Sequence, residues 1–184
     1  KFIFNGLKMG NPDNEDTFYD GTFVKTDKNE KHYIDGLKDG KILLYAGTKY
    51  HLSNWYYQNK LDYLFIDEAS QIAVADLISL GGIAKNIILV GDQQQLGQPT
   101  QGSHPGESKK SVLDYLLENK DTISSEKGIF LNRTFRLHPN INKFTSENFY
   151  ENRLLTDPDN INREIEYSPD CMIKSEGIHT ILMD

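Results

Sequence analysis

The chain has 184 residues and a formal net charge of −7, which argues against binding nucleic acid by bulk electrostatics. Its single cysteine, Cys171, excludes an intramolecular disulfide, and no Cys/His cluster has zinc spacing. No signal peptide or membrane-spanning apolar run is visible, so we expect a cytoplasmic protein away from the membrane. The low hydrophobic content of 38% fits a fragment of a larger α/β protein, in which some sheet or helix faces are not covered by other elements.

The first 40 residues are polar and rich in turns, with short extended segments predicted at residues 2–4 and 22–25. We expect this part of the chain to be peripheral and without chemistry. Three later segments are short and continuously apolar: residues 41–46, 63–66 and 87–90. Unbroken runs of this length are typical of buried parallel strands.

A helix is predicted between the second and third strands, over Gln71–Leu80. Its periodicity places Ile72, Ala75, Ile78 and Ser79 on one face, with Val74 and Leu77 beside them. Gly81-Gly82 predicts that the helix ends in a left-handed residue. Strand, helix and strand with short links form a βαβ unit with a right-handed crossover. The fold class is therefore α/β with a parallel sheet.

Later elements continue the alternation. We predict a helix over residues 112–119 with Leu113, Leu116 and Leu117 inward, and a strand beginning at Ile129. A helix beginning at Pro139 carries Ile141, Phe144 and Phe149 toward a core, and a last strand covers residues 178–183. A domain boundary is expected near residues 120–128.

Two carboxylates, Asp67 and Glu68, follow the second predicted strand at the edge where open α/β sheets bind ligands. Such a pair suits Mg²⁺-nucleotide chemistry, with one carboxylate on the metal and the other orienting a water. The alternative is a pair that caps the following helix. From the dipeptide alone, both interpretations stay open.

Two other polar clusters follow strands. Residues 91–96 (GDQQQL) carry amides able to hold a phosphate and a water, although for this segment by itself we favour a plain polar turn. Residues 133–139 (RTFRLHP) carry two guanidinium groups that could grip phosphate oxygens. The alternative is an ion pair with a surface carboxylate, which we favour for Arg133 over Arg136.

Three segments in one order resemble motifs II, III and IV of superfamily 1 helicases: YLFIDEASQ, ILVGDQQQLGQP and LNRTFRLHPNINKFTSENFYENRL. Within this superfamily, the segments resemble the 5′-to-3′ branch that contains the nonsense-mediated-decay helicase and related nuclease-helicases. YAGTKYHLSN is similar to the segment before motif II, where a Thr contacts the nucleic-acid backbone. The resemblance covers residues 42–154.

The resemblance implies a RecA-like parallel sheet flanked by helices, of the P-loop NTPase type and incomplete here. Residues 1–125 would be the later half of the first RecA-like, ATP-hydrolysing domain, and residues 126–184 the beginning of the second. The parent protein would use ATP and Mg²⁺ to move along single-stranded nucleic acid, with DNA favoured over RNA. Its partners would be that strand and the rest of the parent chain.

The implied roles attach to six residues. Asp67 would coordinate Mg²⁺, Glu68 would be the catalytic base, Gln71 would lie near the nucleotide, Gln95 would couple the γ-phosphate to the strand cleft, Arg136 would be an arginine finger, and Thr48 would contact a backbone phosphate.

The sequence also departs from the family pattern. No G-x-x-x-x-G-K-[ST] is present, motifs V and VI are missing, and Phe135 stands where Tyr is commoner. We therefore expect this internal piece to be inactive alone. Two rival functions stay open: a non-catalytic interaction module with a degenerate helicase fold, and a P-loop ATPase that does not act on nucleic acid.

An aromatic group follows Thr48 and comprises Tyr50, His51, Trp55, Tyr56 and Tyr57. Its rings either stack on unpaired bases or pack beneath the sheet or as a surface lid, and we favour packing.

Overall fold

The computed structural model describes residues 4–11, 13–15, 18–95, 97, 105–118, 120–163 and 178. It forms two compact units, Lys1–Leu113 and Asp114–Asp184. The strand predicted over residues 178–183 lies outside the described residues except for Ile178. In the described part of the chain, no helix combines the length and apolarity needed to cross a bilayer.

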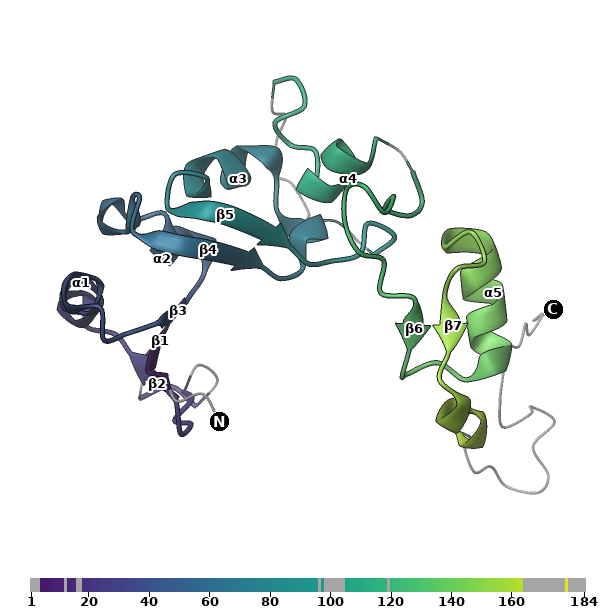
Figure 1. Ribbon diagram of the computed structural model, residues 1–184, viewed down its shortest axis with the longest axis horizontal. Coiled ribbons are helices and arrows are strands. Elements are labelled where there is room, and N and C mark those ends of the chain that lie inside the picture. Colours follow the sequence, from purple (N-terminus) through teal and green to yellow (C-terminus); the bar gives the residue numbers. More distant parts are fainter. Residues whose placement is uncertain are drawn as a thin grey trace, which may run out of the picture. The chain divides into compact units, whose positions relative to one another are not determined.

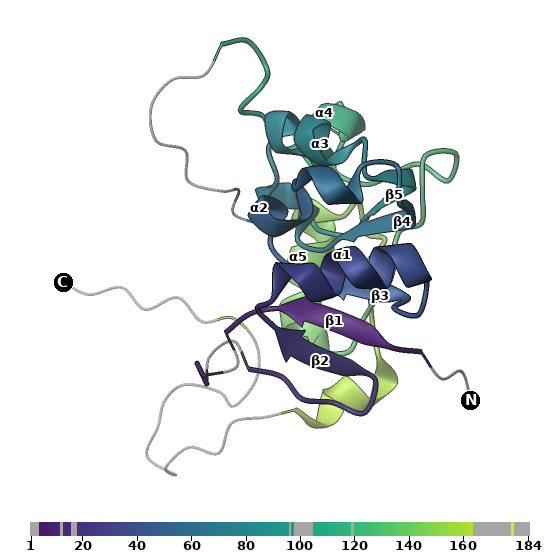
Figure 2. The same ribbon diagram turned by 90° about the vertical axis from the view of Figure 1, so that its left-hand side faces the viewer.

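The first unit contains a three-stranded parallel sheet in the order β2 (Val24–Asp27), β1 (Gly6–Met9), β3 (Leu44–Ala46). Helix α1 (Glu30–Asp39) connects β2 to β3, and β1 lies between its neighbours (Figure 2). The expectation that the first 40 residues are peripheral is wrong. Strands of four residues are too short to show periodicity, and their pairing is not local in sequence.

Helix α1 has clear signals at both ends. The Asn29 side chain accepts a hydrogen bond from Lys31 N at 3.1 Å, and Glu30 stands in the first turn, where the helix dipole favours a carboxylate. Gly40, with φ of 66°, ends the helix in the left-handed conformation, and its N–H donates to Gly36 O.

The predicted βαβ unit is present: β4 (Leu61–Ile66) pairs in parallel with β5 (Ala84–Leu89), and α3 (Val74–Leu80) lies between them in the chain (Figure 1). The predicted helix face is partly wrong: Ile78 is 75% exposed, whereas Ile72 and Leu77 pack against the core and Leu80 is buried in it. Gly81 has φ of −60°, so α3 does not end in a left-handed residue.

The core of the first unit joins its elements through aromatic and aliphatic side chains. Tyr33 from α1 and Tyr57 from the 3-10 helix η1 (Trp55–Tyr57) are fully buried, in one cluster with Leu64 and Ile66 of β4. Between β3 and η1 lies the short helix α2 (Lys49–Leu52), whose His51 and Leu52 are also buried.

The strands are less buried than their apolar sequences predict. Alternate residues of β4 differ: Leu64 and Ile66 are in the core, whereas Tyr63 and Phe65 are 59% and 65% exposed. Leu44 of β3 is exposed as well. Parallel sheets normally carry helices on both faces, so an unbroken apolar run predicts two covered faces. Here one face of β4 has no cover among the described residues, as the low hydrophobic content predicts.

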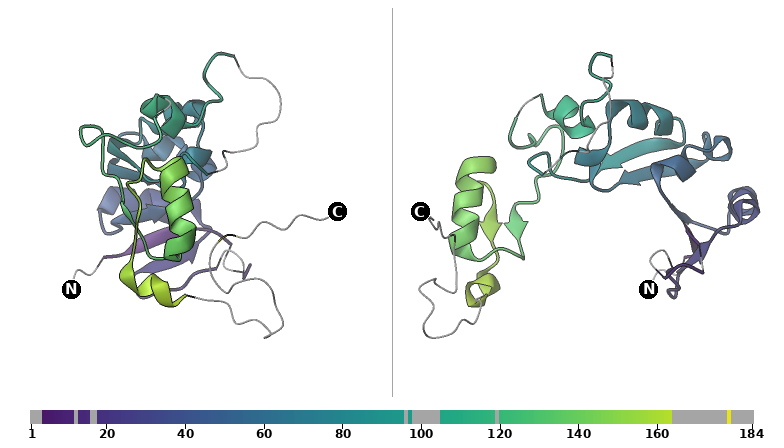
Figure 3. Two further views of the ribbon diagram at one scale, coloured as in Figure 1. Left: turned by 90° about the vertical axis from the view of Figure 1, so that its right-hand side faces the viewer. Right: turned by 180° about the vertical axis from the view of Figure 1, so that it is seen from behind.

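The second unit is smaller. β6 (Arg133–Thr134) pairs in parallel with β7 (Leu155–Thr156), and α5 (Pro139–Phe149) lies beside them (Figure 3). A 3-10 helix, η3 (Pro158–Asn162), follows β7, and α4 (Val112–Leu117) crosses the boundary between the units. Pro139 occupies the first turn of α5, as predicted. The strand predicted from Ile129 is limited to the two residues of β6.

The predicted apolar faces of α5 and α4 are partly wrong. Phe144 and Phe149 of α5 are exposed, and its buried residues are Asn142 and Ser146. Both bond the chain entering β7: Asn142 Nδ2 donates to Leu154 O at 2.9 Å, and Leu154 N donates to Ser146 Oγ at 3.1 Å. In α4, Leu117 is buried but Leu116 is exposed. Hydrogen bonds between the side chains of Asn142 and Ser146 and the backbone of Leu154 therefore help to orient α5.

Candidate functional site

Asp67 and Glu68 form the turn that follows β4, which we call the carboxylate turn. Asp67 Oδ1 accepts a hydrogen bond from Glu68 N at 3.0 Å, and both side chains are exposed. Glu68 has φ of 51°, a left-handed conformation that costs a residue with a Cβ about 1 kcal/mol or more. Glu68 stands at the N-cap of the 3-10 helix η2 (Ala69–Gln71) but makes no capping bond with its side chain. Capping therefore does not account for this carboxylate.

The turn after β5 packs directly on this one. Val90 N donates to Ile66 O at 2.8 Å and Ala69 N donates to Val90 O at 2.9 Å, so strand pairing continues past both strand ends. A Cβ on Gly91 would lie 2.7 Å from Ala69 N, which leaves room only for glycine. The two turns are therefore held against each other at one edge of the sheet.

Asp92 stabilises the turn formed by residues 91–95, which we call the glutamine turn. One of its carboxylate oxygens, Oδ1, accepts from Gln94 N at 3.0 Å, and the other, Oδ2, accepts from Gln95 Nε2 at 3.3 Å. Gln95 N also donates to Asp92 O at 3.2 Å. Leu96 and residues 98–104 lie outside the described residues. The structure thus gives Asp92 a positioning part that the sequence interpretation did not assign.

Four of the predicted site residues therefore share one sheet edge: Asp67, Glu68, Gln71 and Gln95. Gln71 is the last residue of η2; its N–H donates to Glu68 O at 2.9 Å, and its side chain is exposed. The strand register brings these residues to the edge, whereas the individual roles assigned to them stay predictions.

The donor set at this edge fits a magnesium ion that keeps most of its waters. Asp67 has no cationic partner, and Ser70 Oγ is buried without a hydrogen-bond partner, among the residues described. Within the same residues, no group of three His, Cys, Asp or Glu side chains gathers to cage a metal. Mg²⁺ in nucleotide sites takes one or two carboxylates together with water and phosphate oxygens, so a single free carboxylate suffices.

Thr48 lies on the other sheet of the first unit. It follows β3 and stands at the N-cap of α2, where its carbonyl accepts from His51 N and Leu52 N, both at 3.0 Å. Its side chain is exposed and makes no capping bond. The hydroxyl is thus available to a ligand, at the carboxyl end of a parallel strand.

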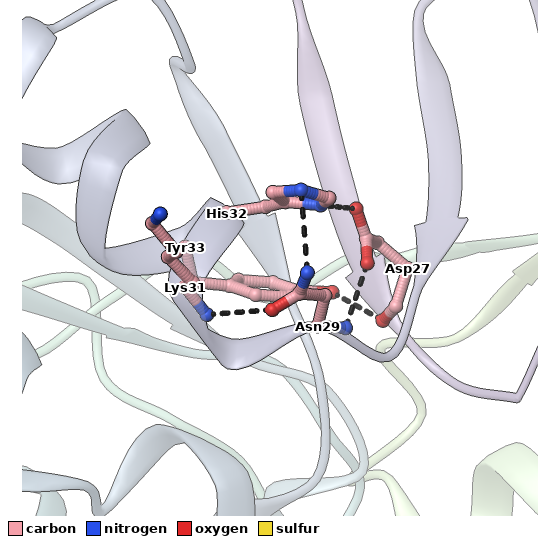
Figure 4. A network of polar contacts seen from close by, with 5 residues as sticks. All are labelled: Asp27, Asn29, Lys31, His32 and Tyr33. Carbon is pink, nitrogen blue, oxygen red and sulfur yellow. Dashed lines mark hydrogen bonds and ion pairs between the residues drawn. The ribbon is translucent and has the colours of Figure 1, made fainter.

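A polar network at the carboxyl end of β2 escaped the sequence interpretation (Figure 4). His32 Nδ1 lies 2.6 Å from Asp27 Oδ2, Asn29 Nδ2 lies 3.3 Å from His32 Nε2, and Tyr33 OH donates to Asp27 O at 2.9 Å. The available signal was an Asn-Glu helix start at residue 29 with a glycine at residue 40.

Arg136 lies on a rigid corner of the second unit. Thr134 Oγ1 accepts from Arg136 N at 3.2 Å and from Leu137 N at 3.3 Å. The buried Asn160 donates from Nδ2 to Thr134 O and Leu137 O, both at 3.1 Å. The corner is therefore fixed on both sides, while the Arg136 side chain is exposed.

The two arginines of this corner differ in their partners. Arg133 Nη1 lies 3.4 Å from Asp157 Oδ2, so the ion-pair interpretation is confirmed for Arg133. Arg136 has no ion pair with any residue that the structure describes. Its guanidinium is thus free to meet a ligand.

Comparison with known proteins supports a helicase family. The chain is 34% identical over 97 residues to the DNA polymerase alpha-associated DNA helicase A of Schizosaccharomyces pombe, and 36% identical over 99 residues to Helicase sen1 of the same organism. These matches cover 52% and 53% of the chain but only 14% and 6% of the relatives. No protein-family model matches the chain.

Proposed function

We propose that the chain is part of an ATP-dependent superfamily 1 helicase, and that the turns after β4 and β5 form the magnesium-nucleotide side of its ATP site. The observation that carries the proposal is the parallel pairing of these strands, from Leu61 with Ala84 to Ile66 with Leu89. This register brings the carboxylate turn and the glutamine turn to one edge, where nucleotides bind in α/β sheets.

Each side chain at this edge then has a chemical task. Asp67 would hold Mg²⁺ through water, and the ion when bound neutralises charge on the phosphate oxygens. Glu68 would orient the attacking water and accept its proton. Gln71 would lie near the nucleotide, and the Gln95 amide, positioned by Asp92, would contact the γ-phosphate.

The remaining roles involve Arg136 and Thr48. Arg136 would act as an arginine finger from a second RecA-like domain, beginning at residue 126. Its guanidinium is exposed and makes no ion pair with the residues that the structure describes, which supports this role. The Thr48 hydroxyl would contact the backbone of a single strand. The name of one relative, a DNA helicase, favours DNA over RNA.

The test is ATP hydrolysis by the full-length protein that contains these 184 residues, with and without Mg²⁺ and single-stranded DNA. Glu68→Gln should abolish strand-stimulated turnover, and Arg136→Ala should reduce it by roughly 10³-fold or more. Glu107→Gln and Arg133→Ala are the matched controls, since Glu107 is exposed outside the site and Arg133 is paired with Asp157.

Three results would contradict the proposal. Near-normal turnover in Glu68→Gln or Arg136→Ala refutes the assigned roles. Hydrolysis that no strand stimulates indicates an ATPase that does not act on nucleic acid. A full-length protein without any hydrolysis indicates a non-catalytic interaction module.

A further inference from the structure

The aromatic rings in the segment after Thr48 fall into a buried set and an exposed set. His51, Tyr56 and Tyr57 are buried, as the packing interpretation expects. Tyr50 and Trp55 are 77% and 76% exposed, so packing does not explain them.

The buried rings give Trp55 a firm support. His51 Nε2 and Tyr57 OH lie 2.7 Å apart, and the ring centroids of Tyr56 and Tyr57 are 4.7 Å apart. The Trp55 indole makes a T-shaped contact with the buried Tyr56 ring at 5.9 Å. Trp55 is therefore attached to a packed cluster although most of its surface meets water.

The Tyr50 ring contacts Lys49, which is itself held by an ion pair to α3. Lys49 Nζ lies 5.4 Å from the centroid of the Tyr50 ring and 2.6 Å from Asp76 Oδ2 in α3. The ion pair fixes α2 to α3 and neutralises the ammonium that would otherwise attract phosphate. What Tyr50 offers a ligand is therefore ring area rather than the charge of Lys49.

We propose that Tyr50 and Trp55 are a stacking platform for unpaired nucleobases of a single strand, beside the backbone contact of Thr48. The proposal rests on the proposed function, because it assumes that Thr48 meets such a strand. Every base has a flat face, so stacking on aromatic rings tolerates any sequence, as a translocating protein requires. Stacking also suits a chain whose net charge of −7 disfavours phosphate-driven binding.

The surroundings favour nucleic acid over an apolar protein partner. The exposed residues that neighbour the two rings in the sequence are polar or charged: Ser53, Gln58, Asn59 and Lys60. An apolar partner needs a continuous apolar patch, whereas a single strand alternates flat bases with a solvated backbone. Separate rings in a polar setting match the strand.

The chain supplies its own probe, since Trp55 is its only tryptophan. The 184-residue chain is titrated with a thymidine oligonucleotide and with an abasic oligonucleotide of equal length, and tryptophan fluorescence is read. We expect quenching by the thymidine strand alone. With a labelled strand, anisotropy should show Kd rising at least about 5-fold in Tyr50→Leu and in Trp55→Leu.

Two control variants separate stacking from general effects. Trp55→Phe keeps an aromatic face and should retain Kd within about 2-fold. Phe18→Leu removes another exposed aromatic ring and should leave Kd unchanged. Circular dichroism checks that each variant keeps the fold.

The outcomes distinguish this proposal from the proposed function. If the strand binds and Thr48→Ala weakens it, but neither ring variant does and no quenching occurs, the platform is wrong and the nucleic-acid role stands. Equal quenching by the abasic strand also overturns the platform. If no strand binds, the platform is refuted, and strand-stimulated hydrolysis by the full-length protein decides the helicase proposal separately.

Discussion

Gly91 packs against the main chain of Ala69, and a Cβ at position 91 would lie 2.7 Å from Ala69 N and 3.3 Å from Ser70 N. The clash would be with backbone atoms, which cannot rotate away as a flexible side chain can. This approach keeps the glutamine turn against the carboxylate turn. It adds to the hydrogen bonds that Val90 makes with Ile66 and Ala69 across the same two turns.

Gly91→Ala should therefore destabilise the first unit and separate the two turns. We expect a loss of about 2 kcal/mol in the free energy of unfolding, the usual size of an overpacking defect. Urea unfolding measures it. The matched control is Gly81→Ala, where the nearest atom to the new Cβ is at an ordinary 3.4 Å and stability should hold or rise slightly. An unchanged midpoint in Gly91→Ala would contradict the packing.

The sequence predicts β4, α3 and β5 because each is long enough to show an apolar run or a helical period. It does not predict β1, and the extended segment predicted at residues 22–25 overlaps β2 only in part. Strands of four residues carry too little pattern and are defined by their pairing with each other. Periodicity also misplaces helix faces: Ile78 is apolar yet exposed, because apolar character alone does not say which side a neighbour covers.

Burial of His51 makes the first unit sensitive to acid. Desolvation holds the pKa of His51 below its ordinary value of 6.5, because the charged imidazolium is disfavoured in the aromatic cluster, and Glu30 opposes this only in part. Above pH 6.5 the imidazole is neutral in both states, and its contribution is complete. As the pH falls below 6.5 the unfolded chain binds the proton first, so stability declines until the folded pKa is reached.

Unfolding by urea at pH 7.5 and at pH 5.5 tests this dependence. The wild-type chain should lose up to about 1.4 kcal/mol per pH unit from this one group within the window. His51→Phe should show a shallower pH dependence of the unfolding free energy. The contribution of the carboxylates is the same in both proteins, so it cancels when the two slopes are subtracted. Equal slopes in the two proteins would show that His51 is not protected from protonation.

Asn160 is the residue that fixes the corner carrying Arg136. Its side chain is buried, donates to two carbonyls of residues 134 and 137, and accepts from Arg163 Nε at 3.0 Å. Asn160→Ala leaves these groups unpaired and should cost about 2 kcal/mol. Hydrogen exchange should speed up at the amides of residues 134–137. Asn140→Ala, at an exposed position, is the control; equal effects of both variants would refute the assignment.

The candidate site, like the fold, could be predicted from the sequence only in part. The contact between the turns after β4 and β5 follows from the sequence, because carboxyl ends of neighbouring parallel strands meet at one edge. The roles of Asp67, Glu68 and Gln95 stay predictions. The network of Asp27, Asn29 and His32 does not follow from the sequence, because Asp27 ends β2 beyond the extended segment predicted at residues 22–25. The exposure of Trp55 was also hidden, since buried and exposed aromatic residues share one sequence pattern.

Two ion pairs of the first unit have similar lengths but different settings, and they should differ in strength. Lys49 Nζ and Asp76 Oδ2 are 2.6 Å apart with side chains 17% and 28% exposed, whereas the Lys85–Asp62 pair, at 2.8 Å, is largely exposed. Water and salt screen the first pair less, so its coupling should be about 1 to 2 kcal/mol and nearly independent of salt. The exposed pair should couple far more weakly.

Double-mutant cycles with alanine at each position, in low and in high salt, measure both couplings by urea unfolding. Asp76→Ala alone should be the costliest single change, because it leaves the Lys49 ammonium partly buried and unpaired. The same variant frees α2 from α3, so it should also alter the setting of Tyr50. Equal couplings in the two pairs would mean that the Lys49–Asp76 contact does not hold α2 in place.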